Sequence, residues 1–105
     1  MGIEENRVEL HLDAEIAELG GITYKWVSPN RAHVPDRIVI LRGNVYFVEV
    51  KTTDGTLSPG QSRELRRLAT YGANAYAAYG RQGINTFIEM IKNAAPAKKL
   101  LPVPA

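Results

Sequence analysis

Apolar residues recur with helical spacing at the start of the chain and gather in strand-like runs further along. From Glu4 to Leu19 they lie three or four positions apart, and Gly20-Gly21 ends the pattern, which predicts an amphipathic helix. Branched and aromatic side chains fill Ile22 to Val27 and indicate a strand. Ser28 to Val34 contains a Pro-Asn pair and is expected to be a loop.

The middle of the chain predicts a hairpin followed by a helix. Asp36–Leu41 and Val45–Lys51 have strand composition, and Arg42-Gly43-Asn44 between them is a turn signal. Ser58-Pro59-Gly60-Gln61 then supplies an N-cap, a proline at the first helical position and a capping-box glutamine. Gly72 is expected to end that helix.

Two further elements complete the order α-β-β-β-α-β-α. Ala75–Tyr79 has the pattern of a short strand, and Ile84–Lys92 that of a last helix. A hairpin followed by a helix and another strand suggests an α/β domain with a central mixed β-sheet flanked by helices. We expect residues 1–93 to form this domain and residues 94–105, which contain proline and lysine, to form a tail.

Length and composition exclude several classes of protein. A chain of 105 residues builds one core, so a two-domain enzyme with its own substrate lobe is excluded. The absence of cysteine excludes a disulfide scaffold, a thiolate zinc site and a cysteine nucleophile. A net charge of +2 is not typical of a polybasic binder. Because no apolar run could span a bilayer and the N-terminus is polar, we expect a cytoplasmic protein without membrane association.

Charged residues stand near the ends of the two hairpin strands. Glu49 and Lys51 are two positions apart and therefore share a face of their strand. A two-residue turn, at Arg42-Gly43 or at Gly43-Asn44, brings Asp36 to the same face, whereas a three-residue loop without a bulge puts it on the other. Gly-Asn is a favoured turn pair, so we expect the shared face.

Two carboxylates beside an ammonium group can bind a hard divalent cation. Oxygen ligands suit Mg²⁺ or Mn²⁺, and such an ion lowers the pKa of water and stabilises charge on a phosphate. Lys51 could orient or deprotonate that water, or stabilise the pentavalent phosphorus. The alternative is a buried salt bridge between Lys51 and Asp36 or Glu49, and the residues alone leave both interpretations open.

Five stretches keep a recognisable order and spacing: Glu18–Gly21, Tyr24–Pro29, Val34–Leu41, Val45–Thr52 and Leu57–Gln61. Together they resemble the VRR-Nuc (virus-type replication-repair nuclease) family of the PD-(D/E)xK nuclease superfamily, over about Glu5 to Ile88. The resemblance implies a single PD-(D/E)xK nuclease-like domain that hydrolyses phosphodiester bonds of DNA with Mg²⁺ or Mn²⁺.

The resemblance also assigns roles to the residues of the second hairpin strand and its neighbour. It implies that Asp36 and Glu49 are metal-binding carboxylates and that Lys51 is the catalytic lysine. The backbone carbonyl of Val50 is implied as a further metal ligand.

Two helix residues are implied as well. Gln61 resembles a glutamine that lies near the active site of the family, and its capping-box role can hold at the same time. A glutamate of the first helix belongs to the metal site, for which we choose Glu9, with Glu5 one turn earlier as the alternative. The chain departs from the family at His33, which stands where a glycine usually precedes the Val-Pro-Asp run.

DNA contact is expected to be electrostatic and not sequence-reading. The candidates are basic and hydroxyl side chains: Lys25, Arg31, His33, Arg37, Arg42, Thr52, Ser58, Arg63, Arg66 and Arg67. Arg63, Arg66 and Arg67 form a basic stripe on one helix, whose alternative role is to keep that surface polar.

The sequence therefore predicts a metal-dependent endonuclease that acts on branched DNA, such as a Holliday junction, or on duplex DNA. Because so small a chain offers little surface to DNA, we expect a homodimer, with Trp26, Tyr24 and the last helix as candidates for its interface. One alternative is a non-catalytic DNA-binding or assembly module with the same fold. Another is a nuclease that acts on flaps or other DNA substrates.

Overall fold

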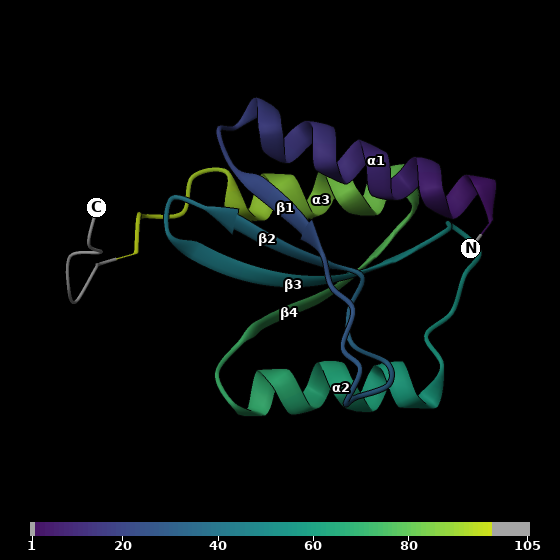
Figure 1. Cartoon of the computed structure of the whole chain (residues 1–105). Coiled ribbons are helices and arrows are strands. Elements are labelled where there is room, and N and C mark those ends of the chain that lie inside the picture. Colours follow the sequence, from purple (N-terminus) through teal and green to yellow (C-terminus); the bar gives the residue numbers. More distant parts are fainter. Residues whose placement is uncertain (1, 98–105) are drawn as a thin grey trace.

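The computed structural model describes residues 2–97 and is drawn in Figure 1. Over these residues the elements in chain order are α1 (Ile3–Glu18), β1 (Ile22–Lys25), β2 (Arg37–Leu41), β3 (Asn44–Lys51), α2 (Pro59–Thr70), β4 (Asn74–Tyr79) and α3 (Gly80–Ile91). The predicted order of elements and the α/β class are confirmed. None of the helices in this part of the chain has the length and apolarity that crossing a bilayer requires.

The four strands form one mixed sheet in the order β1-β2-β3-β4. β1 and β2 pair antiparallel, as do β2 and β3, whereas β4 runs parallel to β3 after the crossover through α2. Figure 1 shows α1 and α3 side by side on one face of the sheet and α2 alone on the other. Because these two strands are parallel, their C-terminal ends, at Lys51 and Tyr79, lie at the same end of the sheet.

The core lies between the sheet and the pair α1 and α3. It is made of aliphatic and aromatic side chains, among them Leu12, Ile16, Val39, Val48, Val50, Ile84 and Phe87. Tyr46 meets Phe87 edge to face, with ring centroids 5.7 Å apart, which is a favourable aromatic geometry. By contrast α2 packs mainly against β4 and buries only Gly60. The face of the sheet below α2 is therefore less completely covered.

A two-residue turn sets the register of the hairpin. Leu41 pairs with Asn44, which leaves Arg42 and Gly43 as the turn. Both have positive φ, 50° and 81°, as a type I′ turn requires. The ladder ends with Arg37 opposite Val48, and one further step puts Asp36 opposite Glu49. Asp36 therefore lies on the face that carries Glu49, as predicted.

The structure corrects two boundaries. The last helix begins at Gly80, not at Ile84, because the chain turns directly from β4 into α3 at Gly80, where φ is +66°. The first strand ends at Lys25 and not at Val27. Of the predicted tail, the part up to residue 97 lies along the hairpin turn, where the amide of Ala97 donates to the carbonyl of Arg42 at 3.0 Å. Residues 98–105 lie outside the described part.

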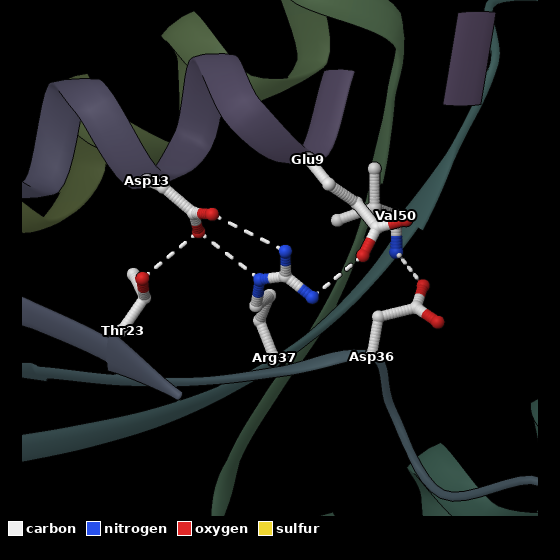
Figure 2. A network of polar contacts seen from close by, with 6 residues as sticks. All are labelled: Glu9, Asp13, Thr23, Asp36, Arg37 and Val50. Carbon is white, nitrogen blue, oxygen red and sulfur yellow. Dashed lines mark hydrogen bonds and ion pairs between the residues drawn. The ribbon is translucent and has the colours of Figure 1, made fainter. Parts of the chain in front are cut away.

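A buried ion network joins α1 to the start of β2 (Figure 2). Arg37 is only 8% exposed; its Nη1 donates to Glu9 Oε1 at 2.6 Å and its Nε donates to Asp13 Oδ1 at 3.0 Å. The hydroxyl of Thr23 on β1 donates to the same Asp13 oxygen at 2.8 Å. The expected DNA contact of Arg37 is thus corrected, because its guanidinium faces α1 and is shielded from solvent.

We predict that Arg37→Met destabilises the fold by about 3 kcal/mol, because it leaves the buried carboxylate of Glu9 without its counter-charge. Urea unfolding followed by circular dichroism measures the change. Arg63→Met, at an exposed arginine, is the matched control and should cost less than about 0.5 kcal/mol. Adding Glu9→Gln to Arg37→Met should restore part of the loss. Equal midpoints for wild type and Arg37→Met would contradict a stabilising role for the network.

Candidate active site

Asp36 lies just before β2 and is fixed by the neighbouring strand. Its Oδ2 accepts a hydrogen bond from the backbone amide of Val50 at 2.8 Å (Figure 2). Pro35, which is buried, precedes it and restricts the backbone at this point. This hydrogen bond occupies Oδ2 of Asp36, whereas Oδ1 takes no part in it. It also brings the backbone of Val50, the implied carbonyl ligand, next to the carboxylate.

Glu49 is the buried carboxylate of the site, at 2% exposure. Its Oε2 accepts a hydrogen bond from Gln61 Nε2 at 3.0 Å and lies 3.6 Å from Lys51 Nζ. Gln61 also completes a capping box, since its Oε1 accepts from the amide of Ser58 and its own amide donates to the Ser58 hydroxyl. Both roles predicted for Gln61 are present together. The start of α2 is thereby attached to the acidic end of β3.

The carboxylates at this end of the sheet disfavour one another's charge. Burial in the first place, and then the charge of Asp36, raise the pKa of Glu49 to about 7, although Lys51 acts in the opposite sense. Burial also raises the pKa of Glu9, against the lowering effect of Arg37, and the charge of Asp36 contributes to that rise. Glu5 adds to the rise at both glutamates. A positive ion among these groups would relieve their repulsion.

Glu9 occupies a different position from the one that a third metal ligand would need. It is 1% exposed and bound to Arg37 through Oε1, while Oε2 is buried and has no hydrogen-bond partner among the described residues. Within residues 2–97 no three His, Cys, Asp or Glu side chains are placed as a group that could hold a metal ion. Glu9 is therefore not grouped with Asp36 and Glu49, because its carboxylate is drawn to Arg37.

The remaining pair of carboxylates still fits a hard divalent cation. Asp36 and Glu49 each use one oxygen in a contact to the protein, Oδ2 and Oε2, so that each has a second oxygen outside those contacts. Carboxylate and backbone carbonyl oxygens are suitable ligands for Mg²⁺ or Mn²⁺, which commonly keep several waters. The site thus combines two acidic side chains with an ammonium group at the end of the two inner strands, β2 and β3.

A basic pocket of about 420 Å³ lies beside this site. The loop between β1 and β2 contributes His33, and α2 contributes Arg63, Arg66 and Arg67. His33 has a φ of 68°, the left-handed conformation that favours glycine, so the chain keeps the glycine-type backbone with a larger side chain. Its ring lies against Gly60, where a Cβ would come within 2.5 Å of it.

The other residues expected to contact DNA lie outside the basic pocket. Arg31 lines a second pocket next to the basic one, and Thr52 follows Lys51 directly. Ser58 is the N-cap of α2. Lys25 is exposed at the end of β1, and Arg42 forms the hairpin turn at the opposite end of β2, where its Nη2 donates to the carbonyl of Lys92.

The sequence analysis missed Asp13 and Thr23, the partners of Arg37. Their signal was present, because Asp13 lies one helical turn after Glu9 and therefore on the same side of the helix. Arg37 lies two positions before Val39 on its strand and therefore shares the buried face of Val39, opposite to the face of the adjacent Asp36. The strand pattern thus held the information that Arg37 turns toward α1.

The raised pKa of Glu49 predicts a particular dependence of stability on pH in metal-free buffer. Between its ordinary pKa of 4.5 and about 7, the native chain keeps a proton that the unfolded chain releases. The contribution of Glu49 to the free energy of unfolding should therefore fall as pH rises through that window and stay constant above it. Urea titrations with EDTA at several pH values should show Glu49→Gln gaining stability relative to wild type across the window. Parallel pH curves for the two proteins would contradict the assignment.

The comparisons with known proteins agree with this geometry. No protein-family model matches the chain. A curated protein of Acyrthosiphon pisum secondary endosymbiont phage 1, named "Putative nuclease p44", is 46% identical over 71 residues, which are 67% of this chain and 76% of that protein. A solved structure described as a VRR_NUC domain is 33% identical with a TM-score of 0.80, covering 86% of this chain and 99% of the other.

Two more distant structures share the fold. One is a VRR_NUC domain protein at 20% identity with a TM-score of 0.63, over 86% of this chain and 88% of the other. The other is Hjc of Archaeoglobus fulgidus, a Holliday junction resolvase, at 22% identity with a TM-score of 0.55, over 71% of this chain and 67% of the other. The fold, the acidic site at the end of β3 and the relatives lead to one conclusion: the chain belongs to the VRR-Nuc family of nucleases.

Proposed function

We propose that this nuclease is a divalent-metal-dependent endonuclease that hydrolyses phosphodiester bonds of DNA and works as a homodimer on branched substrates. The observation that carries the proposal is the pair Asp36 and Glu49, which the hairpin register places on one face at the end of the sheet beside Lys51. Two carboxylates with unengaged oxygens, one of them with a pKa raised to about 7, are costly for the fold unless a positive ion offsets them. The likeness in fold to Hjc, a Holliday junction resolvase, supports branched DNA as the substrate.

The proposed mechanism assigns a separate task to each side chain. Asp36 and Glu49 would hold Mg²⁺ or Mn²⁺ with the carbonyl of Val50, and the ion when bound neutralises charge on the phosphate and lowers the pKa of water. Lys51, which is partly exposed, can donate to a phosphate oxygen or to the attacking water and so stabilise the negative charge that develops on the phosphate oxygens. Gln61 holds Glu49 in place through Oε2. Glu9 is given no ligand role here, because its Oε1 is bound to Arg37.

A homodimer is supported by apolar side chains that the chain leaves uncovered. Ile22, Tyr24 and Val45 are exposed and lie on the face of the sheet that α2 covers only at β4. The register places Ile22 opposite Ile40 and Ile40 opposite Val45, so they form a continuous row. Most apolar side chains of α3 are buried in the core, whereas Met90 is 58% exposed, so this helix offers less apolar surface than the sheet face does. We place Tyr24 at the interface.

The test is a cleavage panel on four-way junctions, flaps and linear duplexes, with a cruciform plasmid added to count the cuts. We expect cleavage only with Mg²⁺ or Mn²⁺, and a loss of about a thousandfold in rate for Lys51→Ala, the size of effect seen when a charge-stabilising group is removed. Glu49→Gln should also be inactive. A dimer should convert the cruciform plasmid directly to linear product, because two sites cut two strands in one encounter.

Arg7→Gln, on the exposed side of α1 across the sheet from α2, is the charge-matched control and should cleave as wild type does. Cleavage at the same rate with and without Mg²⁺ or Mn²⁺, or a Lys51→Ala variant as fast as wild type, would contradict the metal-dependent mechanism. Binding without any cleavage would favour the non-catalytic module. If the cruciform plasmid accumulates as a nicked product before the linear product forms, the homodimer is contradicted.

A further inference from the structure

Two neighbouring pockets run along α2, one basic and one aromatic. The basic pocket measures about 420 Å³ and the aromatic one about 400 Å³, and both are within the usual size of ligand sites. Glu64 and Arg67 line both of them, so the two pockets adjoin. The wall opposite α2 is the loop between β1 and β2, which contributes Trp26 and Arg31 to one pocket and His33 to the other. We call these pockets together the α2 groove.

The basic half of the α2 groove presents cations in a row. Arg63 and Arg67 are one turn apart on α2, Arg66 lies between them, and all three are exposed. Glu64 is the only acidic side chain among the residues that line either pocket. Three guanidinium groups against one carboxylate leave a positive surface, and arginine favours phosphate oxygens through its paired donors. This half of the groove is suited to a chain of phosphates.

The aromatic half offers flat surfaces of a different kind. Trp26 is held in place by Phe47, with ring centroids 5.2 Å apart, and it lines the pocket with Leu68 and Tyr71. Tyr71 follows the last turn of α2 and is 81% exposed, although an aromatic ring gains from being covered. Arg31 and Arg67 stand at this pocket too. Aromatic rings beside arginines form the usual platform on which unpaired bases stack.

The groove lies next to the candidate active site in the chain. Gly60, at its floor, precedes Gln61, whose side chain reaches Glu49. His33, in its wall, is three residues before Asp36 and packs on Gly60. A strand that lies in the groove would therefore pass directly to the acidic end of β3.

We infer that the α2 groove binds an unpaired DNA strand next to the bond that is cut. The phosphates lie on Arg63, Arg66 and Arg67, and bases stack on Trp26 and Tyr71. Bases in a duplex are stacked on one another and cannot offer their faces, so this arrangement selects DNA with unpaired nucleotides over intact duplex. The inference rests on the proposed nuclease function and names its class of substrate.

The test uses the one tryptophan of the chain, Trp26, as its reporter. Short oligothymidylate is titrated into the full chain in EDTA, so that binding is measured without cleavage. We expect quenching of Trp26 fluorescence, whereas a matched abasic oligonucleotide should bind with little quenching. Tyr71→Ala should weaken binding of oligothymidylate about tenfold, and Tyr71→Phe, which keeps the ring, should retain it.

Charge variants distinguish binding in the α2 groove from non-specific electrostatic attraction of DNA to the protein. Arg67→Gln should weaken binding and reduce its salt dependence, whereas Arg7→Gln, on the other side of the sheet, should do so much less. Glu64→Gln should strengthen binding, because it removes the one carboxylate of the groove. These results together support the inference.

The inference is overturned if oligothymidylate leaves Trp26 unquenched, or if Tyr71→Ala binds it as tightly as wild type. It is also overturned if intact duplex competes for the same quenching with equal affinity. Cleavage of duplex or junction DNA in that case leaves the nuclease proposal standing. Conversely, if oligothymidylate quenches Trp26 but no substrate is cleaved, the metal-dependent mechanism is contradicted, whereas binding of an unpaired strand in the α2 groove is supported.

Discussion

The two-residue turn at Arg42 and Gly43 is the constraint on which the site depends. Side chains alternate between the two faces of a strand, so one residue more or less in the turn would send Asp36 to the face of α1. With the observed register, Asp36 lies opposite Glu49 and its Oδ2 accepts from the amide of Val50. The positive φ of both turn residues therefore determines, at the opposite end of the hairpin, which carboxylates meet.

The two faces of the same hairpin handle buried charge in different ways. On the α1 face, Arg37 donates hydrogen bonds to both Glu9 and Asp13, and the resulting network joins the helix to the sheet. On the α2 face, Glu49 has Gln61 and Lys51 as its partners and still faces the charge of Asp36. In the first arrangement one guanidinium contacts both carboxylates directly, and the network serves the fold. In the second, Lys51 lies 3.6 Å from Glu49 and the pKa of Glu49 is still raised to about 7, which is why we assign metal binding to it.

The sequence was sufficient for the order of elements, the shared face of Asp36 and Glu49, and the double role of Gln61, because these follow from alternation and local capping. The burial of Arg37 does not follow from the sequence in the same way, because a charged side chain on a strand is expected at the surface. The start of α3 depends on a tight junction with β4 that leaves no loop signal. The pocket of Trp26 and Tyr71 could not be foreseen, because it forms only where the loop before β2 approaches α2.

The central claim is that Asp36 and Glu49 form a binding site for a divalent cation. Isothermal titration calorimetry of Mn²⁺ into the metal-free chain tests it without any requirement for activity. We expect binding to wild type, loss of binding in both Asp36→Asn and Glu49→Gln, and unchanged binding in Glu64→Gln, which changes a carboxylate of the neighbouring groove. Binding that persists in Asp36→Asn and Glu49→Gln with the affinity of wild type would contradict it.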